Sequence, residues 1–185
     1  NNKIKNELSL VTNKLETNLH PQIRAIAYNC AENLGTYENN DFRSFLLDIK
    51  PEEKSQLSKL GIRIGAKFFF CPNLMKKKQI EFSAVLWKIF NPINSNLFIP
   101  LPTDGRVSFT FDKTLPSTYW LSIGYLHINK FAFRIDVFEK IFYLARTRIK
   151  MGPFLESSEF MNPIGCNSEQ LSNIFKYCGY ESVKL

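Results

Sequence analysis

Histidine is scarce in this sequence, and its cysteines are scattered. The chain has two histidines, His20 and His127, and four cysteines, none of which belongs to a Cys-x-x-Cys pair. Zinc ligands usually come in close pairs, because two ligands on one turn reduce the ordering cost of binding. We therefore expect no metal site. The thiols are better explained as buried side chains of a cytosolic protein; they are Cys30, Cys71, Cys166 and Cys178.

A long apolar run is also missing. No segment approaches the roughly 20 consecutive apolar residues that a membrane-spanning helix needs, although 44% of the 185 residues are hydrophobic. That fraction, with its 17 phenylalanines, is enough to fill a core. The chain does not start with methionine, and residues 1–19 are unlike a signal peptide. We expect a fragment of a longer cytoplasmic protein with no membrane partner.

The sequence contains no complete phosphate-binding loop. Such a loop needs Gly, four residues and then Gly-Lys-Ser/Thr, because its backbone N–H groups surround the phosphates and its hydroxyl binds Mg²⁺. The nearest candidate, GIRIGAK at residues 61–67, has three residues between its glycines, and Phe68 stands at the hydroxyl position. Neither a Ser/His/Asp nor a Cys/His constellation is visible. We therefore expect no catalytic residue and no cofactor in this chain.

Two further candidates for catalysis have simpler explanations. Asp136 and Glu139 form a carboxylate pair, but a helix N-cap with an acid three residues on is typical of a capping box, which accounts for the spacing. His127 lies among aromatic residues, where a packed histidine is favoured over a general base.

Positive charge is what the sequence has in excess. The net charge is +7, and residues 61–80 carry five cations and no acid, while residues 130–150 carry six cations and two acids. This distribution indicates a surface that binds nucleic acid phosphates, although a merely solvated basic face would give the same pattern. The candidate nucleic-acid-binding residues are Arg63, Lys67, Lys76, Lys77, Lys78, Lys130, Arg146 and Lys150.

The periodicity predicts an α+β fold that is predominantly helical. Residues 1–60 are expected to be a helical segment, with helices over 3–18, 21–34, 41–48 and 51–60 and a polar turn at 36–40. Residues 61–185 are expected to be a mixed α+β accessory domain. It would contain extended residues 62–70, a helix over 76–91, a strand at 107–111, a hairpin over 125–135 turning at 129–130, and a helix to about residue 150.

The C-terminal residues 160–180 have the rhythm of a helix-turn-helix, and a winged-helix-like C-terminus is one form that this part could take. A short apolar segment is followed by a turn at Gly165 and a helix that Asn167 caps, with Gln170 at its third position and Gly179 at its end. Recognition of DNA by this helix and simple packing of its apolar face both fit the pattern; we favour packing, because Lys176 is its only cation.

Several segments together resemble one protein family. LGIRIGAKFFFCPNLMK (residues 60–76) is similar to an LGVRFG…LPALLKP segment in the long C-terminal region of alphaproteobacterial superfamily 2 helicases, which are similar to the mitochondrial degradosome RNA helicase. The resemblance continues in RIDVFEK (134–140), which is similar to RVDMLER, and in MNPIGCNSEQLSNIFKYCGY (161–180). It covers about residues 20–181. The sequence departs from the family at Lys77, where proline is usual, and at Cys178, where leucine is.

The resemblance implies a parent protein that hydrolyses ATP with Mg²⁺ in domains preceding this chain and unwinds RNA or RNA–DNA duplexes. This chain would then be a non-catalytic accessory region that guides RNA or another single-stranded nucleic acid. Two alternatives stay open. One is a protein-interaction module that docks the helicase to an exoribonuclease or another partner, and the other is a stand-alone helix-turn-helix DNA-binding regulator.

Overall fold

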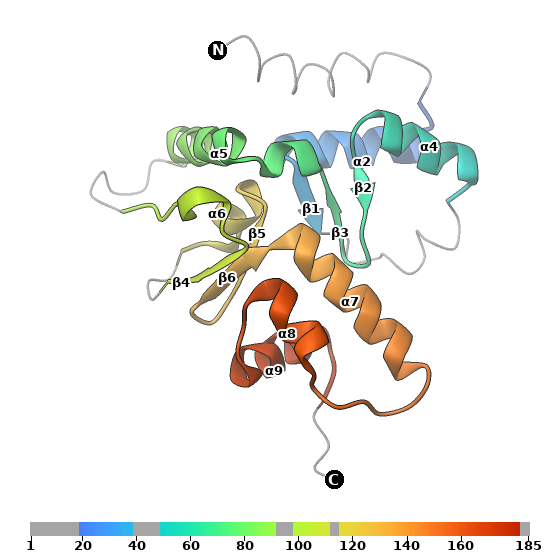
Figure 1. Cartoon of the computed structure of the whole chain (residues 1–185). Coiled ribbons are helices and arrows are strands. Elements are labelled where there is room, and N and C mark those ends of the chain that lie inside the picture. Colours follow the sequence, from blue (N-terminus) through green and yellow to red (C-terminus); the bar gives the residue numbers. More distant parts are fainter. Residues whose placement is uncertain (1–18, 39–48, 92–97, 112–114, 182–185) are drawn as a thin grey trace.

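The structure is a computed structural model that describes residues 19–38, 49–91, 98–111 and 115–181 (Figure 1). The helices expected over 3–18 and 41–48 lie outside the described residues. Seven α-helices and two three-stranded sheets are described, so the predicted α+β, mostly helical fold is confirmed. None of the described helices combines the length and the apolar character that crossing a membrane requires.

Helices and strands are interspersed along the described chain, which ends in three successive helices. The first half has α2 (Pro21–Glu32), β1 (Thr36–Glu38), α4 (Pro51–Lys59), β2 (Arg63–Ile64), β3 (Phe68–Phe70) and α5 (Lys77–Phe90). The second half has β4 (Ser108–Thr110), α6 (Ser117–Ser122), β5 (Tyr125–Ile128), β6 (Phe131–Arg134), α7 (Ile135–Ile149), α8 (Ser158–Ile164) and α9 (Ser168–Tyr177). In Figure 1, α5, α2 and α4 line one side of the molecule, the sheets lie in the middle, and α7 to α9 cover the other side.

The first sheet has the order β1-β3-β2, and both pairings are antiparallel. Its strand β1 corrects the prediction of a polar turn at 36–40 and of an entirely helical segment up to residue 60. Thr36 and Tyr37 suit a strand, but only β3, about thirty residues further on, supplies the partner. Tyr37 pairs with Phe69 and stacks on its ring at 6.2 Å.

The middle strand β3 explains why three consecutive phenylalanines occur at residues 68–70. Successive side chains of a strand point to opposite faces of the sheet. Phe68 and Phe70 enter one core with α7, α8 and α9, whereas Phe69 enters a second core with α2 and α4. All three rings are buried, so this strand connects the two cores.

The second sheet has the order β4-β6-β5. The predicted hairpin over 125–135 is confirmed as β5 and β6, and it turns at Asn129-Lys130, where Asn129 has φ of 55°. This sheet and α6 pack against α5 in a third core rich in aromatic rings, among them Trp87, Tyr119 and Trp120.

The C-terminal corner agrees with the predicted capping. The Asn167 side chain accepts from the Gln170 N–H at 2.8 Å, and the Gln170 side chain accepts from the Asn167 N–H at 3.0 Å. Gly165 has φ of 72°, which glycine adopts without steric strain, and it separates α8 from α9. No strand follows α9 up to residue 181, so the described corner is a helix pair without a wing.

His127 is packed, as the sequence predicted. Its ring stacks on Trp120 with centroids 4.6 Å apart, and its Nε2 lies 3.4 Å from the Phe111 carbonyl oxygen. Burial lowers the pKa of this imidazole below its usual range, although the Phe111 carbonyl opposes the shift.

The lowered pKa predicts that the protein loses stability in mild acid. Unfolded His127 takes up its proton near pH 6.5, whereas the folded side chain does so only at lower pH. The contribution of the neutral His127 imidazole to the free energy of unfolding is therefore fully present above about pH 6.5. It is lost as the pH falls through the pKa that this side chain has in the folded protein. Urea unfolding at pH 7.5, 6.5 and 5.5 should show this decline, and His127→Gln should flatten it. An equal decline in both proteins would contradict the prediction.

Candidate functional site

A cleft lies between α7 and the segment from α4 to the residues just after β3. Its volume is about 850 Å³. In Figure 1 the orange helix α7 runs past the loop that joins β2 and β3. This loop forms part of the cleft wall opposite α7. Five cationic side chains line the cleft: Lys54, Arg63, Lys140, Arg146 and Lys150.

Helical spacing brings three of these cations together on α7. Lys140 is three residues before Tyr143, which is three before Arg146, and Lys150, the C-cap of α7, follows Arg146 by four, so these steps of three and four residues keep the side chains on one face. Tyr143 and Thr147 complete this row, which spans about 15 Å along the helix axis. The opposite face of α7 is apolar and buried in the core through Phe138, Ile141 and Ala145.

The two acids in the cleft are already engaged within the protein. Asp136 forms a two-point ion pair with Arg134, in which Nε lies 3.0 Å from Oδ1 and Nη2 lies 2.6 Å from Oδ2. Glu139 is 5% exposed, and its carboxylate accepts hydrogen bonds from the backbone N–H groups of residues 66, 67 and 68. An incoming anion would therefore face five cations and two compensated carboxylates.

The bonds of Glu139 overturn the predicted capping box. Helix α7 begins at Ile135 with Arg134 as its N-cap, so Asp136 does not cap it and Glu139 lies in its second turn. Instead, Glu139 Oε1 accepts from the N–H of Lys67 at 2.9 Å and of Phe68 at 2.7 Å, and Oε2 accepts from the N–H of Ala66. Three hydrogen bonds stabilise the Glu139 carboxylate more than the single hydrogen bond that it would accept in a capping box.

Two opposing influences act on the Glu139 carboxyl. Burial is the larger and raises its pKa above the usual glutamate range, because desolvation disfavours the charged form. The three backbone N–H groups and the Lys67 ammonium lower the pKa, because they stabilise the carboxylate.

The same bonds explain the glycine-rich segment at residues 61–67. Successive backbone N–H groups directed at one point form an anion-binding concavity, but here the protein's own Glu139 fills it. Gly65 is needed for this approach, since a Cβ there would lie 2.3 Å from the Glu139 carboxyl carbon. The segment thus resembles a phosphate loop in its donors, and its anion is an internal carboxylate.

The cleft collects only part of the predicted nucleic-acid-binding set. Arg63, Arg146 and Lys150 line it together, whereas Lys67 does not. The Lys67 ammonium lies 3.2 Å from Glu38 Oε1 and 3.6 Å from the centre of the Tyr177 ring, so it joins β1 to α9.

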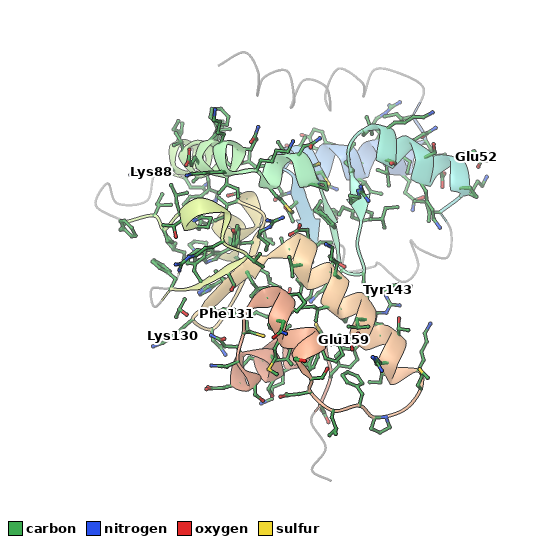
Figure 2. The ribbon with its side chains drawn as sticks, in the orientation of Figure 1. Glu52, Lys88, Lys130, Phe131, Tyr143 and Glu159 are labelled. Atoms are coloured by element: carbon green, nitrogen blue, oxygen red, sulfur yellow. The ribbon has the colours of Figure 1, made fainter. Side chains whose placement is uncertain are left out.

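The other predicted cations lie on different surfaces. Lys76, Lys77 and Lys78 lie at the start of α5, and Lys130 lies at the β5–β6 turn, where Figure 2 labels it. The structure adds two lysines to the cleft that the predicted set omitted, Lys54 and Lys140. The spacing of Lys140 from Arg146 and Lys150 could have revealed it, but nothing local to Lys54 indicates that α4 faces α7.

One exposed aromatic side chain lies among these cations. Tyr143 is 70% exposed and lines the cleft, and Figure 2 labels it on α7. Its neighbour Phe142 points into the core instead, where it stacks on Phe138 and contacts the Tyr180 ring edge-on. The cleft therefore offers both positive charge and an aromatic face.

Helix α9 lacks the features of a DNA-recognition helix. The Ser168 hydroxyl is bonded to Glu156, Gln170 is held in the capping box, and Glu169 is exposed near the helix start. Lys176 is its only cation. The apolar side chains of α9 are directed into the core, as the packing interpretation predicted.

No family model, curated protein or solved structure matches the chain.

Proposed function

We propose that this chain is a non-catalytic accessory region of an ATP-dependent RNA or RNA–DNA helicase and that it guides single-stranded nucleic acid. The resemblance to the helicase C-terminal region supplies the context, in which ATP and Mg²⁺ bind in the parent's other domains. The observation that carries the proposal is the cleft, which gathers five cations from three separate elements. The phosphate backbone is the ligand whose charge this lining complements.

Charge compensation strengthens the case for a phosphate ligand. Because Asp136 is paired with Arg134, and Glu139 with three backbone N–H groups, neither acid needs the cleft cations as partners. Lys54, Lys140 and Lys150 are exposed, so their ammonium groups can exchange water and counterions for phosphate oxygens. The row on α7, about 15 Å long, can contact a few successive nucleotides.

The proposal predicts a specific loss of salt-dependent binding. In the variant Lys140→Gln/Lys150→Gln, affinity for a fluorescent oligouridylate should fall on the order of tenfold at low salt. The slope of log affinity against log salt should flatten by about 1.4 units, since each single-strand phosphate contact contributes about 0.7. Fluorescence anisotropy titrations at several salt concentrations would measure both quantities.

Two comparison variants make this test specific. Lys88→Gln/Lys176→Gln removes the same charge from exposed positions outside the cleft, and it should leave the slope nearly unchanged. Lys76→Gln/Lys77→Gln/Lys78→Gln tests whether the start of α5 also touches the strand. Equal losses in the cleft variant and in Lys88→Gln/Lys176→Gln would indicate only a general effect of net charge, and the cleft would not be the site.

One observation favours the second candidate, a protein-interaction module. Helix α5 exposes three apolar side chains, Val85 at 56%, Ile89 at 65% and Phe90 at 74%. Val85 and Ile89 are four residues apart and so share one face of the helix, and exposed apolar patches are typical of protein interfaces. An exoribonuclease, the partner that the resemblance implies, could bind there. Binding of this kind would respond little to salt, so the salt series separates it from strand guidance.

A further inference from the structure

The position of Tyr143 carries an inference about what kind of strand the cleft accepts. Tyr143 lies three residues after Lys140 and three before Arg146, and all three line the cleft. Its ring is therefore flanked by a cation on either side along one face of α7. An aromatic face between phosphate-binding cations is the arrangement with which proteins hold unpaired bases.

The wall of the cleft contributed by the β2–β3 loop carries small side chains. Gly65 and Ala66 line the cleft across from α7, and neither carries a bulky side chain. Glu139, one turn before Tyr143, bonds the backbone of residues 66–68. The carboxylate therefore fixes α7 against the loop near the level of the ring, and the cleft is formed before any ligand arrives.

We propose that Tyr143 is the base-stacking platform of the cleft and that it makes the site select unpaired strands over duplexes. This inference rests on the proposed function of the cleft. The cations attract any nucleic acid backbone, paired or unpaired, and so do not discriminate. A base can stack on Tyr143 only if it is unpaired, because in a duplex both faces of each base are already covered by its neighbours.

The test compares two probes, an oligouridylate and an RNA duplex of the same length, with the whole 185-residue chain. Tyr143→Leu should weaken oligouridylate binding between about fivefold and 100-fold, the loss expected for one stacked base. Binding to the duplex should stay within about twofold, and the salt slope should not change, because no phosphate contact is removed. Tyr143→Phe should restore most of the lost affinity, since it restores the ring.

Tyr28 provides a matched control. It is another exposed tyrosine, 55% accessible, on α2 and outside the cleft, so Tyr28→Leu should not affect either probe. Circular dichroism and thermal melting would confirm that each variant is folded. Unchanged oligouridylate affinity in Tyr143→Leu, or equal losses for both probes, would overturn the stacking proposal while leaving strand guidance standing. Failure of the unmodified chain to bind either probe would overturn both.

Discussion

Replacing Glu139 with alanine should lower the free energy of unfolding by about 3–5 kcal/mol. The carboxylate satisfies the backbone N–H groups of residues 66, 67 and 68, and the Phe68 N–H is buried. Alanine would leave these donors without their acceptor and would also open a space at a nearly buried position. Urea unfolding at neutral pH, followed by circular dichroism, measures the change.

Gly65→Ala tests the same contact from the other side. An added Cβ would lie 2.3 Å from the Glu139 carboxyl carbon and 2.6 Å from each of its oxygens, so the carboxylate would have to move away from its donors. In a Glu139→Ala background this clash is gone. The double variant should therefore be hardly less stable than Glu139→Ala alone, giving a strong coupling between the two positions.

If the losses of stability in Gly65→Ala and Glu139→Ala were additive in the double variant, this explanation would be contradicted, because the effects of independent sites add and those of sites in contact do not.

Glu139→Gln is a useful intermediate. Its amide keeps one acceptor oxygen but turns an N–H donor toward the loop, so the loss of stability should fall between zero and that of Glu139→Ala. A loss in Glu139→Gln equal to that in Glu139→Ala would show that a single acceptor oxygen is not enough to hold the loop.

Leu171→Ala should cost about 2–4 kcal/mol of stability. Leu171 is fully buried and packs in the core that holds α7, α8 and α9. Ile174, on the next turn, is 1% exposed, so the volume that Leu171 vacates would lie inside the core. Thermal or urea unfolding gives the magnitude.

A control for Leu171→Ala separates packing from nucleic acid recognition. Asn173, on the same helix, is half-buried. Asn173→Ala should leave affinity for RNA or DNA within about twofold, well below the 1–3 kcal/mol of a good base contact. A tenfold loss of DNA affinity in Asn173→Ala, with the fold intact, would instead favour the DNA-binding regulator.

The local parts of the fold were predictable from sequence. The capped start of α9, the Gly165 turn and the Asn129-Lys130 hairpin all depend on residues within a few positions of each other, so their signals lie in short windows. Strand β1 was missed because its pairing partner is distant. Three residues carry too little pattern to distinguish a turn from a strand until β3 is placed beside them.

The cleft was only partly predictable for a related reason. Basic stretches identified Arg63, Arg146 and Lys150, but charge alone could not separate them from Lys67, whose partners are Glu38 and Tyr177. The prediction that Glu139 completes a capping box was wrong for a clear reason. Its carboxylate oxygens accept from backbone N–H groups some seventy residues earlier in the chain. A backbone donor is present at almost every residue, so the sequence gives no sign of which ones Glu139 will meet.

The first sheet has a consequence for any attempt to divide this chain. Strand β3 has β1 on one edge and β2 on the other, and its three phenylalanines are buried. A polypeptide that began at residue 61 would lose β1 and α2, which would uncover the backbone edge of β3 and one face of Phe69. Unpaired hydrophobic edges recruit further strands, so such a truncated piece would tend to self-associate. Limited proteolysis between β1 and β2 need not have this result, since the two cut pieces can remain paired.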